Sequence, residues 1–254
     1  GFTGTFSYDG AGNIDLNLTA VPTPPSITGC GWRGAAVYPI DVAGNGAASV
    51  GNYLYGFGGA ISSAVANSYK FDGATWSPIA PLPVGLSGAA VASDGSSVYI
   101  VGGVDSGGAT QTALYRYNPA SNTYTTLAPA MTAAYGSGAV ILNGKLYKIG
   151  GFDFNGFALN KAEVYDIASN SWAPVANYPV AAGSLSIFAQ SGFVYGAGGT
   201  DSAFVALTKT DRYDPLSNSW SDGAIADLPM ARTGAAGARY NNSLVMAGGY
   251  VEGD

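Results

Sequence analysis

Short runs of apolar and β-branched residues alternate along this chain with segments rich in Gly, Pro, Asn and Asp. In residues 88–128, for example, the runs 88–92, 98–101, 113–117 and 123–127 are separated by turns or polar loops. Runs of this length bounded by turn formers are typical of β-strands. Because no window keeps the 3.6-residue apolar period over a helical length, the pattern predicts an all-β chain with almost no helix.

Five Gly-Gly pairs punctuate these runs at nearly even intervals. They begin at Gly58, Gly102, Gly150, Gly198 and Gly248, so successive pairs are 44, 48, 48 and 50 residues apart. Aromatic pairs seven residues apart follow in the same phase: Tyr69 and Trp76, Tyr117 and Tyr124, Tyr165 and Trp172, Tyr213 and Trp220. A period in the range of about 20–50 residues indicates a repeat architecture in which neighbouring units bury each other's apolar faces.

This pattern of a small strand, an apolar strand ending in Gly-Gly, a Tyr and then a Trp resembles the kelch repeat. The match runs from Arg33 to Gly249. The resemblance implies a β-propeller with about five four-stranded blades around a channel. The first strand of each blade would line that channel, and we assign these strands to residues 34–37, 88–91, 137–140, 184–187 and 234–237.

The two ends of the chain predict how the ring closes. Residues 1–20 look like an outer strand pair, residues 21–32 like a Pro-rich link, and residues 33–254 like the kelch repeats of one propeller domain. The last repeat contains only its first two strands, so we expect the strand around 6–8 to pair with 244–247 and complete it. The alternative is that the chain is part of a longer one, because kelch rings more often have six or seven blades.

Composition favours an extracellular setting. Only 10% of residues are charged, against roughly 25% in ordinary globular domains. The net charge of −6 and the scattered ten Lys and Arg argue against nucleic acid, which needs a clustered basic face. No apolar run approaches the length of a membrane span. The chain starts at Gly1 without Met, which fits either removal of a signal peptide or a piece of a longer chain. Together with the composition, this leads us to expect a secreted or cell-surface protein.

Missing residue types exclude several chemistries. The chain has no histidine and one cysteine, Cys30. These counts exclude Ser-His-Asp catalysis, His-ligated zinc, thiolate clusters and an internal disulfide. They also exclude the copper site of galactose oxidase, an enzyme that carries kelch repeats. We therefore expect no cofactor, no metal site and no enzymatic activity.

Three aspartates occupy equivalent positions. Asp105, Asp153 and Asp201 each follow a Gly pair by two residues, at the start of the loop between the second and third strands. Such carboxylates suit a Ca²⁺ site or a polar ligand platform. The favoured interpretation is that each caps its own turn.

Other candidates for the same face are cationic and aromatic. The resemblance suggests Arg33 and Arg232, because basic residues hold carboxylates at this mouth in kelch proteins that bind acidic peptides and in kelch sialic-acid epimerases. Aromatic side chains outside the repeat pattern also lie near these loops, namely Phe154 and Tyr250 together with Phe152, Phe157, Tyr135 and Tyr178. The repeat Tyr and Trp residues are expected between blades.

Two functions remain open. The first is a non-catalytic propeller that binds a protein or a glycan, mediates adhesion, or assembles with other copies or with envelope subunits. The alternative is a secreted carbohydrate-active enzyme, a sugar epimerase or glycan-cleaving enzyme, that uses Asp153, Glu163 or Asp201 with Arg at the channel mouth.

Overall fold

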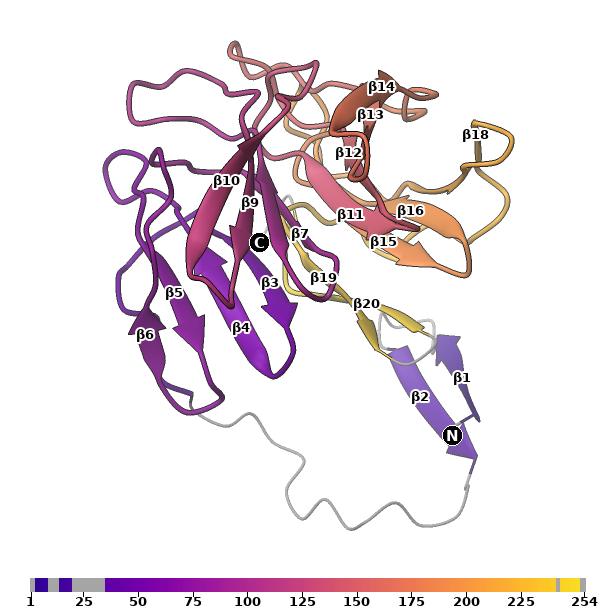
Figure 1. Cartoon of the computed structure of the whole chain (residues 1–254). Helices are drawn as coiled ribbons and strands as arrows, with labels where there is room; N and C mark the ends of the chain where they lie inside the picture. The colour runs from indigo at the N-terminus through magenta and orange to yellow at the C-terminus, as the bar shows by residue number, and fades with distance from the viewer. Residues whose placement is uncertain (1–2, 9–13, 20–34, 241–242, 252–254) are drawn as a thin grey trace. The chain divides into compact units, whose positions relative to one another are not determined.

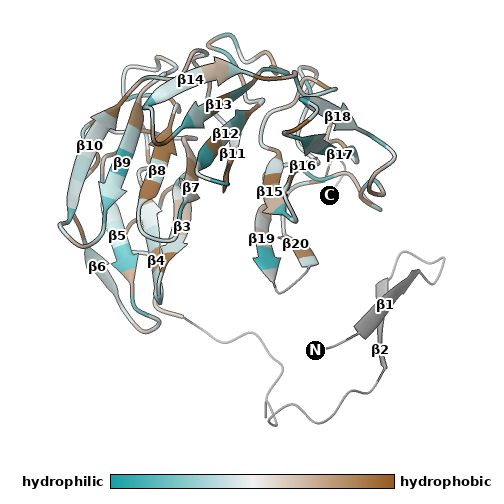
Figure 2. Ribbon diagram, turned by 45° about the vertical axis from the view of Figure 1, so that its right-hand side comes forward, coloured by the Kyte–Doolittle hydropathy of each residue, from teal (hydrophilic) through white to brown (hydrophobic). Residues whose placement is uncertain are grey.

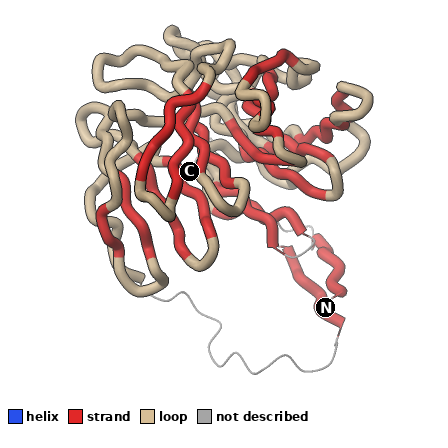
Figure 3. Tube along the Cα trace, in the orientation of Figure 1, coloured by secondary structure: helices blue, strands red, loops and turns tan. Residues whose placement is uncertain are grey.

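The computed structural model describes residues 3–8, 14–19, 35–240 and 243–251. It divides into two compact units, residues 1–35 and residues 36–254, which are described separately (Figure 1). All regular structure in the described ranges is strand, and none is helix, as predicted (Figure 3). The described chain therefore also contains no helix with the length and hydropathy needed to cross a membrane.

The larger unit consists of antiparallel sheets that repeat along the sequence. Blades 1 to 4 each contain four strands, and a half-blade contains two. Their strands are β3 (Gly46–Val50), β4 (Tyr53–Phe57), β5 (Ser68–Phe71) and β6 (Trp76–Pro78) in blade 1; β7 (Ala90–Ser93), β8 (Val98–Val101), β9 (Leu114–Asn118) and β10 (Thr123–Leu127) in blade 2; β11 (Gly138–Leu142), β12 (Lys145–Ile149), β13 (Ala162–Asp166) and β14 (Ser171–Pro174) in blade 3; β15 (Ser186–Gln190), β16 (Phe193–Ala197), β17 (Thr210–Asp214) and β18 (Ser219–Ser221) in blade 4; and β19 (Ala236–Tyr240) and β20 (Ser243–Ala247) in the half-blade.

The blades are arranged as in a propeller. The first strands pack side by side in the series β3, β7, β11, β15 and β19, and later strands of each blade lie progressively farther out (Figure 2). The predicted all-β kelch architecture is confirmed. The described residues form four complete blades and one half-blade, where the repeat pattern had suggested about five full ones.

The first strand of blade 1 was predicted wrongly. It is Gly46–Val50 and not 34–37. In every repeat the first strand begins close to twelve residues before its Gly pair, and this spacing leads from Gly58 back to Gly46. The other four first strands begin one or two residues later than predicted. Residues 46–50 are thus the innermost strand of blade 1.

The Gly pairs end the second strand where another backbone approaches closely. A Cβ at Gly150 would lie 2.2 Å from the carbonyl oxygen of Ala182, and one at Gly102 would lie 2.5 Å from that of Ala134. Both residues also have positive φ, 62° and 70°. Glycine is required for both reasons.

Backbone hydrogen bonds join successive blades around the channel. The amide of Gly88 donates to the carbonyl of Gly44, Gly136 to Gly88, Ser184 to Gly136, and Gly234 to Ser184, at 2.7–3.0 Å. All five residues have positive φ and lie fourteen residues before a Gly pair. This chain of bonds fixes the first strands relative to one another and so positions the loops beside them.

Aromatic side chains fill the space between blades, as predicted for the repeat tyrosines. Tyr117, Tyr165 and Tyr213 are at most 2% exposed. Trp172 and Trp220 are only half-buried. Each indole N–H donates at 2.8 Å to a backbone carbonyl that follows the last strand of the preceding blade, that of Ala128 or Ala176. Figure 2 shows brown, hydrophobic positions on β8, a second strand, and on β15, a first strand.

The smaller unit contains one hairpin. Strand β1 (Thr3–Tyr8) pairs antiparallel with β2 (Ile14–Thr19), so the predicted N-terminal strand pair is present. The Pro-rich link lies outside the described residues. Completion of the half-blade by this hairpin stays a prediction.

Candidate functional site

The loops between second and third strands define one face of the larger unit, here called the loop face. They span residues 58–67, 102–113, 150–161 and 198–209, and alternate strand directions place them all at the same end of their blades. The turns between first and second strands and between third and fourth strands lie at the other end, the hairpin face. Loops held on a rigid scaffold are the usual location of binding residues.

Asp105, Asp153 and Asp201 cap these loops in one repeated geometry. One carboxylate oxygen of each accepts two backbone amides, from the residues two and four positions later, at 2.8–3.0 Å. Asp105 also accepts the Gln111 side-chain amide at 2.6 Å. The bonds match the turn-capping interpretation. No group of three or more His, Cys, Asp or Glu within the described ranges could hold a metal ion.

The capped loops of blades 3 and 4 display apolar side chains to solvent. Phe154 is 70% exposed and Phe204 is 67% exposed, and Phe157 and Val205 beside them are exposed as well. We call these four residues the apolar ridge. Tyr250, beyond the half-blade on the same face, is 59% exposed. Exposed aromatic side chains of this kind often mark an interaction surface.

The two loops that form the ridge are joined to each other. The amide of Ala158 donates to the Ser202 hydroxyl at 2.9 Å. Beneath them, Phe152 is buried and its ring lies 6.4 Å from that of Phe204 and 5.4 Å from that of Tyr135. The ridge is therefore supported from below and spans two blades.

Phe204 has an unusual backbone conformation. Its φ is 63°, in the left-handed region. The equivalent residues of the two preceding loops are Gly108 and Gly156, whose φ values are 84° and 81°. A bulky side chain is disfavoured in this region, so blade 4 carries a strained, exposed Phe where the other two loops have Gly. Strain of this kind concentrates at functional sites.

The sequence identified this surface only in part. Phe154, Phe157 and Tyr250 are exposed as predicted, whereas Phe152 and Tyr178 are buried, and Tyr135 is half-buried. Phe204 and Val205 were missed. They lie five and six residues after Gly199, as Phe157 lies six after Gly151, so alignment of the loops on their Gly pairs would have shown them.

The predicted cationic candidates do not form a pair in the described chain. Arg33 lies outside the described residues. Arg232 is half-buried, and its guanidinium donates to the carbonyl of Gly248 at 2.9 Å. It therefore braces the end of the half-blade.

A hollow also lies on the loop face, next to Asp105. Its volume is about 360 Å³, and it separates the loops of blades 1 and 2. Asp105, Ser63, Ser87, Ser106 and Tyr135 line it. The loop face thus combines the apolar ridge of blades 3 and 4 with a separate hollow between blades 1 and 2.

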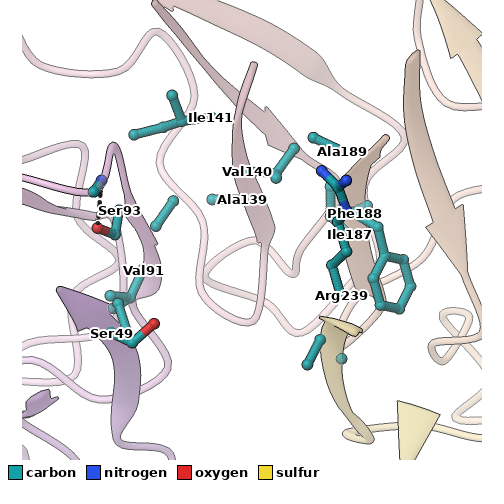
Figure 4. Close-up of a pocket in the computed structure, with 15 residues that line it drawn as sticks. Ser49, Val91, Ser93, Ala139, Val140, Ile141, Ile187, Phe188, Ala189 and Arg239 are labelled. Atoms are coloured by element: carbon teal, nitrogen blue, oxygen red, sulfur yellow. Dashed lines mark hydrogen bonds between the residues drawn. The ribbon is translucent and has the colours of Figure 1, made fainter. Parts of the chain in front are cut away.

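A second cavity lies at the hairpin-face mouth of the channel. It has a volume of about 480 Å³ and is lined by residues of all five first strands. Arg239 lies beside Phe188 on one wall, and Ser49 and Ser93 lie across from them (Figure 4). The other lining residues are Gly, Ala, Val and Ile.

Glu163, a carboxylate considered for enzymatic chemistry, is engaged in the core. It is 2% exposed and binds Lys148 at 3.1 Å. It also accepts the backbone amides of Met131 and Thr132, at 2.6 and 3.1 Å. Desolvation lowers the pKa of Lys148. These contacts fasten the connection between blades 2 and 3 to strand β13.

A second buried carboxylate occupies the equivalent position of blade 4. Asp211 is fully buried, and among the described residues no group reaches either of its oxygens with the geometry of a hydrogen bond. The Tyr178 hydroxyl interacts with this carboxylate. Lys209 is 4.0 Å away and binds Asp222 more closely. Burial raises the pKa of the Asp211 carboxyl, and the nearby carboxylates of Asp222 and Asp227 raise it further.

Comparisons with known proteins agree with this architecture. A family model described as the KLHDC2/KLHL20/DRC7 Kelch-repeats domain matches residues 44–249. Among solved structures, one named "Structure of YjhT" is similar with a TM-score of 0.71 and 20% identity, over 85% of this chain and 75% of that one. No curated protein matches the chain. The likeness to the solved structure supports the fold alone. Because the family model covers most of the chain in phase with its blades, the chain belongs to the kelch-repeat domain family.

Proposed function

We propose that this kelch propeller is an extracellular binding module that recognises a protein through its loop face. Kelch domains are generally non-catalytic scaffolds for protein interaction. The low charge content of the chain supports an extracellular location. The contact residues we propose are those of the apolar ridge, with Tyr250 and the hollow beside Asp105 at its margin.

The observation that carries the proposal is Phe204. Its left-handed backbone costs about 1–2 kcal/mol, and its ring remains 67% exposed. Folding gains little from such a residue, whereas a partner that buries the ring would gain apolar contact area. Aromatic anchors supply much of the affinity of protein interfaces.

Nothing in the site favours the alternative of a carbohydrate-active enzyme. Asp153 and Asp201 are each engaged by two amides of their own loop, and Glu163 is buried against Lys148. Acid and base groups for glycoside cleavage need to face one substrate across roughly 5–10 Å. These three carboxylates are instead committed to holding local structure.

Affinity capture with matched variants tests the proposal. Wild-type protein, the double variant Phe154→Ser with Phe204→Gly, and the control Leu216→Ser would be immobilised and exposed to surface proteins of the source cells. Leu216 is a suitable control because it is 97% exposed and lies in the turn between β17 and β18, on the hairpin face.

We expect the wild type and the Leu216→Ser variant to retain the same protein and the double variant to lose it. Equal retention by all three would refute the ridge as the contact. Loss of binding after enzymatic deglycosylation of the retained protein would show that the ligand is a glycan. Protection of the kelch chain from protease added to intact source cells would contradict the extracellular location.

A further inference from the structure

The hollow between blades 1 and 2 lies where blade 2 has small residues at positions that blade 3 fills with aromatic rings. In each blade, the residue three positions before the first strand exchanges two backbone hydrogen bonds with the residue after the Gly pair. In blade 3 these residues are Tyr135 and Phe152, whose ring centroids are 5.4 Å apart. In blade 2 they are Ser87 and Val104, so the equivalent space stays open.

Blade 1 widens the hollow on its other side. Its loop 58–67 contains ten residues, whereas loop 102–113 contains twelve. Its residue after the Gly pair is Ala60, which also lines the hollow. The resulting volume of about 360 Å³ is near the lower end of the range of about 300–1,000 Å³ that small-molecule pockets occupy. The hollow therefore has room for a ligand built on one ring.

Most polar side chains of the hollow are hydroxyls. Ser62, Ser63 and Ser106 are exposed, and Ser87 is half-buried. Each serine hydroxyl can donate one hydrogen bond and accept two. The hydroxyl groups of a sugar have the same capacity, so hydrogen bonds between the two sets can form in either direction.

Asp105 adds a stronger acceptor. One of its carboxylate oxygens accepts the amides of Gly107 and Ala109, and the other accepts the side-chain amide of Gln111 at 2.6 Å. A carboxylate has about four acceptor positions, so one is left for a hydroxyl of a ligand. Hydrogen bonds to an ionised acceptor are about twice as strong as neutral ones. This contact would therefore orient the ligand.

Tyr135 supplies an aromatic wall. Its side chain is half-buried and lines the hollow. A Cβ built at Gly88 would lie 3.6 Å from Cδ2 of the Tyr135 ring, and the Phe152 ring packs against it from blade 3. The ring is thus held in place and offers an apolar surface to the C–H groups of a sugar ring, next to the serine hydroxyls.

The charge of the hollow narrows the class of ligand. Among the described residues that line it, Asp105 is the only charged one. An anionic ligand would meet this carboxylate without a compensating cation, and like charges placed together disfavour binding. A metal ion would lack further carboxylates, since no group of three metal-binding side chains occurs in the described ranges. These features favour an uncharged ligand with several hydroxyl groups.

We infer that the hollow binds one neutral sugar unit in its pyranose form. Asp105 and the serine hydroxyls bind its hydroxyl groups, and Tyr135 packs against its ring. The inference rests on the proposed function in placing the hollow at the margin of the binding face, and it assigns this part of the face its own ligand. Binding of the sugar itself requires no protein partner and can be measured with the isolated chain.

Saturation-transfer NMR and calorimetry with the full chain test the ligand class. The probes are methyl α-glucopyranoside, methyl β-galactopyranoside and methyl α-mannopyranoside, and we expect saturable binding of at least one. The corresponding uronic acid glycoside should bind at least about tenfold more weakly, because its carboxylate meets Asp105. No saturable binding of any neutral probe would overturn the inference. Tighter binding of N-acetyl-lysine amide than of all three sugars would identify a site for a lysine side chain, and would overturn it as well.

Three variants test the location. Ser87→Tyr introduces the residue that blade 3 carries as Tyr135, and should abolish sugar binding because it fills the hollow. Asp105→Asn should weaken binding at least about tenfold through loss of the charged acceptor. The matched control is Asp201→Asn, which changes the same turn cap in blade 4 and should leave sugar binding unchanged. Equal affinities of the Asp105→Asn and Asp201→Asn variants would overturn the assignment to the hollow.

The double variant Phe154→Ser with Phe204→Gly separates this inference from the proposed function. It should bind the sugar as the wild type does while losing the protein partner. Loss of sugar binding in this variant would overturn the assignment to the hollow. If saturating free sugar weakens capture of the partner by the wild type, the sugar is carried by that partner. If capture is unchanged, the hollow binds a free sugar, and either source satisfies the inference.

Discussion

Substitutions at Phe204 measure whether its strained conformation is real. Phe204→Ala keeps a Cβ in the left-handed region, whereas Phe204→Gly removes it. Relief of that conformation is worth about 1–2 kcal/mol, and the greater freedom of Gly in the unfolded chain subtracts about 0.5–1 kcal/mol. Gly should therefore exceed Ala in the free energy of unfolding by roughly 0.5–1 kcal/mol.

Both substitutions also remove the contact between Phe204 and Phe152, whose ring centroids are 6.4 Å apart. An aromatic pair contributes about 0.5–1.5 kcal/mol. Phe204→Ala should thus be destabilising by that amount, and Phe204→Gly should lie close to the wild type. Urea unfolding followed by tryptophan fluorescence gives both values.

Phe154 provides the matched control, because it is equally exposed but its φ is not positive. There the order should reverse, with Ala more stable than Gly by about 0.5–1 kcal/mol. If Gly is less stable than Ala at position 204 as well, Phe204 is not strained, and the argument that it is retained for binding fails.

Three further predictions concern contacts within and between the blades. Lys148→Met should reduce the free energy of unfolding by about 3–5 kcal/mol, because it leaves the Glu163 charge buried and uncompensated. In urea unfolding, the double variant with Glu163→Gln should recover much of this lost free energy. If the losses of the two single variants simply add in the double variant, Lys148 and Glu163 do not stabilise each other. Burial raises the pKa of Asp211 above its ordinary value of 3.8, so the folded state binds the proton more tightly and stability falls as pH rises from 3.8 through the raised value. Asp211→Asn should therefore raise the melting temperature at pH 7 and raise it less near pH 4. If the difference in melting temperature between this variant and the wild type does not change with pH, the pKa of Asp211 is not raised by burial. The Asn170 side-chain oxygen accepts the Tyr165 hydroxyl and the backbone amide of Ala128 in the preceding blade. Asn170→Ala removes both hydrogen bonds and should cost about 0.5–1.5 kcal/mol for each. Asn155 is also exposed, and Asn155→Ala should cost almost nothing in the same thermal unfolding assay, because only its backbone amide caps the loop.

The period of the Gly pairs was sufficient to predict the fold class, because each pair is required by a close backbone contact. Gly102 and Gly150 have no room for a Cβ, so the pattern persists where other positions vary. The first strand of blade 1 was misplaced because Gly-Ala-Ala occurs at both 34–36 and 46–48. Composition cannot distinguish the two, whereas the spacing to Gly58 does.

The functional face was less accessible to sequence reasoning. Turn capping by Asp153 and Asp201 follows from residue type and position. Exposure does not, since Phe152 is buried while Phe154, two residues later, is exposed. The path of the loop decides which aromatic side chain points outward. The strain at Phe204 comes from its positive φ, and a sequence with Phe at this position gives no sign of a positive φ.

Site-directed photocrosslinking tests the binding function most directly. A photoreactive phenylalanine analogue would replace Phe154 in one preparation and Leu216, at the opposite end of the blades, in another. On intact source cells we expect a discrete crosslinked protein from position 154, displaced by excess wild-type protein but not by the Phe154→Ser, Phe204→Gly double variant. Crosslinks of equal yield from position 216, or competition by the double variant as effective as that by the wild type, would contradict recognition through the loop face.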